Sequence, residues 1–170
     1  KSGFMIIDQE AAQERILYEQ YMQQMENEAM PVQKLLFPES LSFSPQDADT
    51  ISNLLNDFLH LGFELEVFGK NTFILNGMPS GFDNQNVQSI MEQILENYKS
   101  NLLSLRLNRK NNLAHSLAKT LGIKKGCPLL QEEMHHMVQQ LFVCQSPEIS
   151  PSGKKICVVF SDKDIIQLFN

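Results

Sequence analysis

The chain has 170 residues, of which 42% are hydrophobic and 20% charged, and its formal net charge is −6. This composition is ordinary for a globular protein, and the length suffices for one domain or two lobes that share a core. A protein that coats DNA needs an excess of Lys and Arg, so the acidic balance leaves room only for a local basic patch. No apolar run reaches the length of a membrane span and no signal peptide is visible, so we expect a cytoplasmic protein.

The three cysteines, Cys127, Cys144 and Cys157, are widely spaced and form no C-x-x-C pair. An odd number with this spacing favours neither a disulfide framework nor a structural zinc site, so we expect reduced, partly buried thiols. The chain begins at Lys1 rather than Met, and we expect it to be a fragment of a longer protein.

The first expected element is a buried strand, Phe4-Met5-Ile6-Ile7, which leads directly into a helix that Asp8 caps. From Gln9 to about Glu28 the chain has no Gly or Pro, which predicts one long helix that ends before Pro31. The apolar residues that recur every four positions along it are Leu17, Tyr21 and Met25.

Acidic residues gather at the start of this helix. Glu10 follows the Asp8 cap in the first turn, and Glu14 lies one turn beyond Glu10 on the same face. Three carboxylates at one end of a helix could hold a divalent metal ion. The helix dipole alone also favours acids at this end, so the chemistry leaves both interpretations open.

The segment from Asp8 to Glu19 resembles the D-Q-H-A-x-x-E-x-x-x-x-E motif of the MutL family of DNA mismatch-repair proteins, which lies in the family's C-terminal dimerisation domain. Asp8, Gln9, Ala11, Glu14 and Glu19 match the motif, and Glu10 stands where the family has histidine. The resemblance implies a homodimer and a nucleoid-associated place in the cytoplasm. In the full-length protein it implies an ATP-binding region before this domain, together with a mismatch-recognition protein and DNA as partners, and no membrane.

The next expected element is an edge strand or extended segment from Val32 to Pro38, because Pro38 cannot donate to a ladder. Gln33, Leu36 and Pro38 resemble the Q-x-x-L-x-P motif with which MutL proteins bind the DNA polymerase sliding clamp. The resemblance implies that Leu36 enters an apolar pocket of the clamp while the Gln33 amide hydrogen-bonds at its rim. The alternative is a plain core strand.

The segment after Ser44-Pro45 predicts a capped helix that runs to Leu61 and stops at Gly62. Its expected buried face consists of Ala48, Ile51, Leu54, Leu55 and Phe58. Alternation in Phe63 to Phe68, followed by Gly69-Lys70-Asn71 and a second apolar run from Thr72 to Leu75, predicts a hairpin.

Residues 81–152 show only helical spacing, whereas Ile156 to Phe160 again indicates a strand, and Ser161 with Asp164 predicts a capped last helix. This order predicts a two-lobed α/β (α+β) fold with a small mixed sheet. We expect a discontinuous dimerisation lobe, residues 1–80 plus 153–170, and an inserted all-helical lobe of the regulatory type, residues 81–152. In the MutL family the sheet-bearing lobe makes the homodimer, and the resemblance implies the same here.

MutL proteins that nick DNA join the acidic motif to an A-C-x-x-A-[IV]-[KR]-A helix and a late C-P-H-G-R-P loop. Together these segments supply Cys, His and carboxylate ligands for divalent ions that activate water. The corresponding segments here are Leu113 to Thr120 and Ser150 to Lys155. Ala114, Ser150 and Ser152 replace their Cys and His residues.

The remaining pair, Asp8 and Glu14, could bind Mg²⁺ or Mn²⁺ only weakly. We therefore predict a domain with no catalytic residues, no cofactor and no endonuclease activity. The alternative is a metal-dependent nicking endonuclease that uses Asp8, Glu10 and Glu14.

A third hypothesis is a regulatory module that binds DNA through the basic residues of the helical lobe. The residues expected to contact the DNA backbone are Arg106, Arg109, Lys110 and Lys119, and the alternative is a solvated helix face. His135 and His136 point about 100° apart on a helix and cannot chelate one ion together. His115 is expected on a polar helix face.

Overall fold

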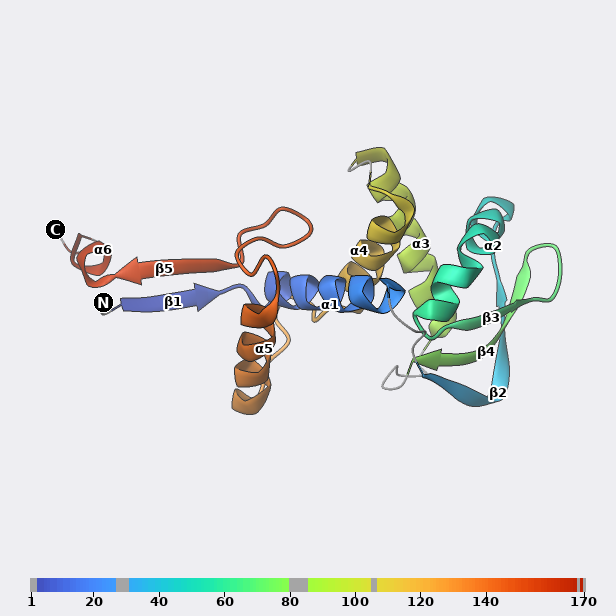
Figure 1. The fold of residues 1–170 in the computed structure, drawn as a ribbon, viewed down its shortest axis with the longest axis horizontal. Coiled ribbons are helices and arrows are strands. Elements are labelled where there is room, and N and C mark those ends of the chain that lie inside the picture. Colours follow the sequence, from blue (N-terminus) through green and yellow to red (C-terminus); the bar gives the residue numbers. More distant parts are fainter. Residues whose placement is uncertain (1–2, 27–30, 80–85, 105–106, 168, 170) are drawn as a thin grey trace. The chain divides into compact units, whose positions relative to one another are not determined.

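The computed structural model describes residues 3–26, 31–79, 86–104, 107–167 and 169 (Figure 1). The elements in chain order are β1 (Gly3–Ile7), α1 (Gln9–Glu26), β2 (Val32–Ser42), α2 (Pro45–His60), β3 (Glu64–Val67), β4 (Thr72–Pro79), α3 (Val87–Ser104), α4 (Arg109–Leu121), α5 (Gln131–Val143), β5 (Cys157–Ser161) and α6 (Asp162–Gln167). The predicted α+β fold class is confirmed. Instead of one mixed sheet, these residues form two antiparallel sheets, one of β1 with β5 and one in the order β2-β4-β3.

The chain divides into two compact units. One unit comprises Lys1–Glu19 with Leu121–Asn170, and the other comprises Gln20–Thr120, so α1 runs across the boundary. These bounds differ from those of the expected lobes, 1–80 plus 153–170 and 81–152, because the terminal strands pair with each other and not with β2 to β4. The assignment of dimerisation and regulation to two lobes stays a prediction.

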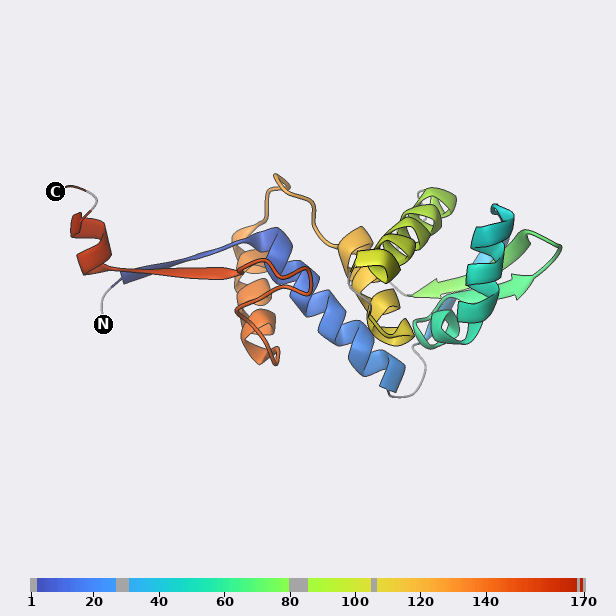
Figure 2. The same cartoon turned by 90° about the horizontal axis from the view of Figure 1, so that it is seen from above.

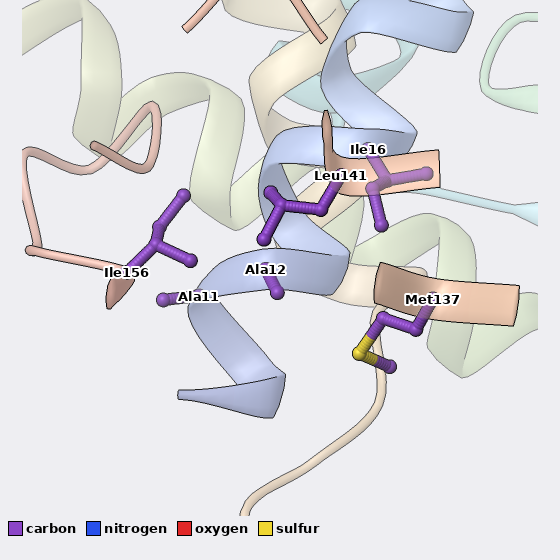
Figure 3. Packing of buried hydrophobic residues seen from close by; sticks show 6 residues of the cluster. All are labelled: Ala11, Ala12, Ile16, Met137, Leu141 and Ile156. Carbon is purple, nitrogen blue, oxygen red and sulfur yellow. The ribbon is translucent and has the colours of Figure 1, made fainter. Parts of the chain in front are cut away.

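The core of the first unit forms where α5 packs on the start of α1 (Figure 3). Ala11, Ala12 and Ile16 of α1 lie against Met137 and Leu141 of α5, and Ile156 completes the buried cluster. The alanines of α1 have little side-chain volume, so the larger side chains of α5 fill the space between the helices. Ile7 and Cys157, at the base of the two-stranded sheet, pack against the same cluster.

The junction between β1 and α1 forms as the sequence predicted, but β1 itself, expected to be buried, is exposed from Gly3 to Ile6 because only β5 pairs with it. The Asp8 backbone N–H donates to Ile156 O at 2.9 Å, and Asp8 Oδ1 accepts a hydrogen bond from the Ala11 N–H at 3.0 Å. Asp8 is therefore the N-cap of α1, and it joins the end of β1 to the chain just before β5. The predicted cap of the last helix is also confirmed, since Ser161 Oγ accepts from the Asp164 N–H at 3.3 Å.

The second unit places helices on one face of the three-stranded sheet. Ala48 and Ile51 of α2, Leu95 of α3 and Phe73 of β4 form a buried cluster, with Phe43 edge-on to Phe73. The predicted cap of α2 is confirmed by a 3.2 Å hydrogen bond from the Asp47 N–H to Ser44 Oγ, and Gly62 follows the helix at φ +85°. Leu55, expected on the buried face, is only half-buried.

Helices α3 and α4 (Figure 2) are joined by hydrogen bonds that polar side chains donate. Asn101 Nδ2 donates to Ser116 Oγ at 3.1 Å, and Asn112 Nδ2 donates to Tyr98 O at 2.9 Å. Because buried amides need partners, these bonds fix how the two helices pack. No helix within the described ranges is long and apolar enough to cross a membrane.

Candidate functional site

The acidic helix and the late loop, which are more than 130 residues apart in the sequence, lie side by side in the first unit. The Ser152 hydroxyl donates a hydrogen bond to Glu14 Oε1, and Glu14 itself is buried. These are residues of the two segments that the resemblance identified as parts of one metal site. The structure therefore brings the segments together, with a serine hydroxyl beside the glutamate.

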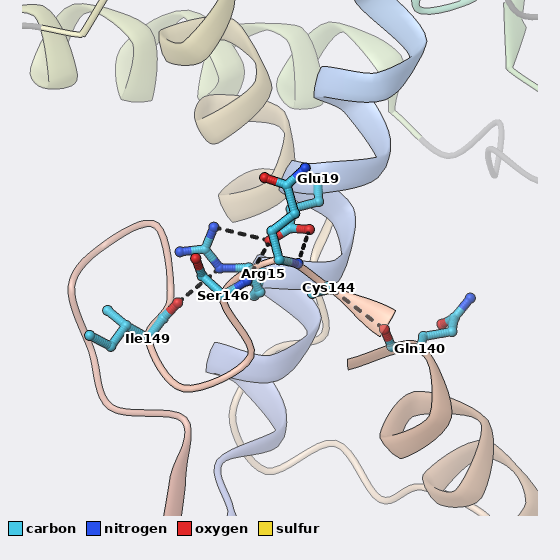
Figure 4. A network of polar contacts seen from close by, with 7 residues as sticks. Arg15, Glu19, Gln140, Cys144, Ser146 and Ile149 are labelled. Atoms are coloured by element: carbon cyan, nitrogen blue, oxygen red, sulfur yellow. Dashed lines mark hydrogen bonds and ion pairs between the residues drawn. The ribbon is translucent and has the colours of Figure 1, made fainter. Parts of the chain in front are cut away.

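A second set of contacts joins α1 to residues 145–149, which connect α5 to the late loop (Figure 4). Glu19 accepts hydrogen bonds from the Gln145 N–H at 2.8 Å and the Ser146 N–H at 3.3 Å. Arg15 Nε donates to Ile149 O at 2.8 Å and pairs with Glu19 at 3.4 Å. Glu14 and Glu19, the glutamates that match the family motif, thus accept hydrogen bonds from other groups of the protein. Arg15, which sequence reasoning did not single out, adds a hydrogen bond and an ion pair to this contact.

The loop has its own turn, which presents Ser152. The Gly153 N–H donates to Ser150 O at 2.9 Å, and the Ser150 N–H donates to Lys154 O at 2.8 Å. Gly153 has φ +80°, a conformation that favours glycine. Ser150, in the place of the family's cysteine, is buried and accepts from the Lys154 N–H through its hydroxyl.

The other two carboxylates expected as possible ligands, Asp8 and Glu10, lie at the start of α1. Asp8 uses its carboxylate to cap α1, and the side chain of Glu10 is half-buried. Ala114 is fully buried in α4, in the second unit. In the part of the chain that the structure describes, no group of three or more His, Cys, Asp or Glu side chains is placed to hold a metal ion.

The segment that resembles the clamp motif leaves the β2 ladder as a bulge. Lys34 pairs with Gly77 and Glu39 with Leu75, so residues 35–38 stand opposite Asn76 alone. Within the bulge Leu36 is 93% exposed and Phe37 is 84% exposed. The interpretation as a plain core strand is therefore wrong for this segment, because neither side chain enters the core.

Local sequence explains the bulge. Pro38 has no N–H to donate to β4, and extra residues in one strand of an antiparallel pair must loop out. Gly77 lets the beginning of β2 lie close to β4, since a Cβ there would overlap Val32 and lie 3.0 Å from Gln33 O. Sequence reasoning missed Phe37, because the clamp-motif resemblance rests on Gln33, Leu36 and Pro38 and the spacing along the strand does not show which side chains a bulge exposes.

Two basic residues of the second unit, Arg109 and Lys110, make polar contacts within that unit. Arg109 Nε lies 3.0 Å from Asp57 Oδ2, and Asp57 is buried in α2. Lys110 Nζ donates to Met25 O at 3.2 Å near the end of α1, whereas Lys119 is exposed. Arg106 lies outside the described residues, so the proposed DNA contact of these four residues stays a prediction.

The histidines differ from expectation in one case. His135 and His136 are exposed neighbours on α5, and His135 Nδ1 lies 2.9 Å from Gln131 O. His115 was expected on a polar face but is buried in α4, so that expectation is wrong. The face of α4 toward the core includes polar residues, namely Asn112, His115 and Ser116, which sequence spacing does not distinguish from a solvated face.

The sequence pattern of one protein family, the MutL C terminal dimerisation domain, matches residues 1–129. The chain belongs to this family. The family description implies that the chain forms a homodimer. Its match includes the acidic helix and the bulged strand but ends before the late loop that carries Ser152.

Three curated relatives bear the name DNA mismatch repair protein MutL. The protein of Chlorobium chlorochromatii is 31% identical to this chain, that of Parabacteroides distasonis 32% and that of Chloroherpeton thalassium 33%, each over 99% of this chain. The chain spans 26 to 28% of the length of these relatives.

The cysteine thiols of the first unit provide a test of the contact between α5, α1 and the late loop. Burial, followed by the nearby Glu19 carboxylate, raises the pKa of Cys144 to about 11, with Arg15 acting in the opposite direction. Burial also raises the pKa of Cys157, whereas Cys127 is exposed. Because the thiolate is the reactive form, a raised pKa lowers the reactive fraction at a given pH.

We predict that iodoacetamide at pH 8 modifies Cys127 first and Cys144 slowest, since roughly one Cys144 in a thousand is then a thiolate. Peptide mass spectrometry against time measures each rate. Raising the pH to 9 should speed Cys144 about tenfold. Equal rates for Cys127 and Cys144 would contradict the packing described for the first unit.

Proposed function

We propose that the chain is the homodimerisation and partner-docking domain of a MutL-type DNA mismatch-repair protein and has no endonuclease activity. The observation that carries the proposal is the apolar two-stranded ribbon of β1 and β5, in a chain that belongs to a family of dimerisation domains. The relatives' name, DNA mismatch repair protein MutL, supports the context of mismatch repair. As part of the proposal, the full-length protein acts in the nucleoid-associated cytoplasm, with DNA and a mismatch-recognition protein as its partners.

The ribbon carries apolar side chains on both faces. Phe4 stacks on Phe160 with ring centroids 5.2 Å apart, and Ile6 stands opposite Val158 on the same face. The other face carries the opposed pair of Met5 and Val159. A two-stranded pair is marginally stable alone in water, and exposed strand edges pair readily with another chain. These features support a second copy of the chain as the cover of the ribbon.

We predict that Val159→Glu weakens the homodimer at least tenfold, because a carboxylate on the ribbon would have to be desolvated on association. The matched control is Val67→Glu on β3, since Val159 is 65% and Val67 54% exposed. Sedimentation equilibrium of the 170-residue chain measures both association constants. A wild-type chain that stays monomeric at high micromolar concentration would refute the proposed homodimer.

The bulge of β2 supports the proposed docking of a sliding clamp. It offers Leu36 and Phe37 as exposed apolar side chains, and Gln33 is exposed in the paired part of β2 just before it. Affinity in such peptide sites comes from a few apolar anchors that fill pockets, and a nearby amide gives direction. The backbone of the bulge is held at both ends by β4, so little conformational entropy is lost on binding.

We predict that Leu36→Ala weakens binding to a purified bacterial sliding clamp at least tenfold and that Gln33→Ala weakens it severalfold. Leu59→Ala on the exposed side of α2 and Gln139→Ala on α5 are the controls and should bind as the wild type does. Surface plasmon resonance with immobilised clamp measures the affinities. Unchanged binding by Leu36→Ala would exclude the bulge as the docking segment.

The absence of endonuclease activity is proposed from the residues at the ligand positions. Alanine and serine stand where the nicking members of the family have cysteine and histidine, and Glu14 accepts a hydrogen bond from Ser152. A neutral serine hydroxyl is a far weaker ligand for transition metals than a thiolate or an imidazole. The alternative function, nicking through Asp8, Glu10 and Glu14, would have to rest on carboxylates alone.

We predict that the chain does not nick supercoiled plasmid DNA in about 5 mM Mn²⁺. A Mn²⁺ concentration on the order of millimolar is sufficient to fill a weak carboxylate site. Agarose gel electrophoresis of the relaxed form measures the rate. Nicking that depends on Mn²⁺ and disappears in Glu14→Ala, but persists in the surface variant Glu132→Ala, would refute the proposal and favour the endonuclease.

The third hypothesis, a regulatory module that binds DNA, has less support. Arg109 and Lys110 make contacts inside the second unit, so DNA binding through them would cost those contacts. Lys119 remains an exposed candidate. No observation among the described residues favours this hypothesis over dimerisation.

A further inference from the structure

Helix α5 has an exposed apolar stripe beside its buried face. Met137 and Leu141 point into the core of the first unit. Leu130, Met134, Val138 and Phe142 recur every four residues and are exposed or at the border of exposure. Residues four apart lie on one side of a helix, so these side chains form one continuous strip. This strip is called the α5 stripe below.

Charge is missing along most of the helix that carries the α5 stripe. The acidic residues of α5, Glu132 and Glu133, lie in its first turn, and from Met134 to Val143 the sequence has no Asp, Glu, Lys or Arg. A helix with a solvated face normally places charged side chains there. Loss of charge around large apolar and Met side chains is the composition of the core of a protein interface.

The β1–β5 ribbon is too small to hold a dimer by itself. It has five residues in each strand. A stable interface takes about 20–30 residues from each partner, so the homodimer needs more surface. In the first unit the α5 stripe is a further row of exposed apolar side chains.

The base of the ribbon and α5 pack against the same hydrophobic core. Ile7 and Cys157 at the base of the ribbon pack on the cluster that contains Met137 and Leu141 of α5. Figures 1 and 2 both show α5 running across the direction of the ribbon, close to its base. Met5 and Val159 continue outward on the face of the ribbon that carries Ile7 and Cys157. The two exposed surfaces therefore keep a fixed geometry within one unit.

We propose that the α5 stripe is the second part of the homodimer interface and that its occupant is the first unit of a second copy of this chain. The inference rests on the proposed homodimer and extends it to a named helix face. A two-fold dimer buries the same surface on both copies, so the α5 stripe of each chain would be buried in the interface. Charge at any stripe position would then lie in the interface of both copies.

The test uses Val138→Glu and Phe142→Glu, each of which places a carboxylate in the α5 stripe. The matched control is Val143→Glu, because Val143 is 86% exposed and lies about half a turn round the helix from Met134. Sedimentation equilibrium should show an association constant at least tenfold lower for the two stripe variants and an unchanged one for the control. Circular dichroism melting curves report whether each variant is folded.

A second measurement uses the wild-type chain and so does not depend on a variant that folds. Hydrogen peroxide oxidises exposed thioethers, so the rate for Met134 reports whether the stripe is covered. Met134 should be oxidised at least fivefold more slowly above the dimer dissociation constant than below it. Met22, half-buried in the part of α1 that belongs to the second unit, is the internal reference and should show no such dependence.

The outcomes separate this inference from the proposed function. A wild-type dimer that is weakened by Val159→Glu but not by either stripe variant, with Met134 oxidised equally at all concentrations, overturns the α5 stripe and leaves the homodimer standing. A wild-type chain that is monomeric at every concentration overturns both. Weakening by the stripe variants together with protection of Met134 supports the inference.

Discussion

The contact between the first half of α1 and the chain around β5 holds the first unit together. It joins segments more than 100 residues apart through the Asp8 N–H to Ile156 O bond, the Glu19 bonds to the chain before the late loop and the Ala11–Ala12 packing against α5. Each of these polar links contributes on the order of 1 kcal/mol, and those to the charged Glu19 contribute more. Without these contacts nothing would hold the end of β1 and the start of β5 together, because the two strands come from opposite ends of the chain.

The same contact gives the residues of the acidic motif a structural role. In the nicking members of the family the motif provides metal ligands, whereas in this chain Asp8 caps a helix, Glu14 accepts from Ser152 and Glu19 binds backbone N–H groups. A carboxylate is as suited to accepting hydrogen bonds as to binding a cation, since both use its lone pairs. The family signature is thus retained as structure in these positions.

The surfaces left apolar divide between the two units. The ribbon and the α5 stripe belong to the first unit, and the bulge with Leu36 and Phe37 belongs to the second. Dimerisation and docking to a clamp would therefore use different units of one chain, so a change that disrupts one should leave the other intact. The ribbon, the α5 stripe and the bulge each belong to a hydrogen-bonded strand pair or a helix, and such preorganisation lowers the entropy lost on binding.

Local sequence determined most of the secondary structure, since periodicity, caps and breakers act over a few residues. Asp8, Ser44, Gly62 and Ser161 fixed the ends of their helices, and the family resemblance followed from twelve residues of the acidic motif. Tertiary structure decided what local signals cannot carry: that β1 pairs with β5, that the chain around Pro38 bulges out with Leu36 exposed, and that His115 is buried. Each depends on which distant segment covers a given face, and a residue's spacing along its own helix or strand contains no information about its cover.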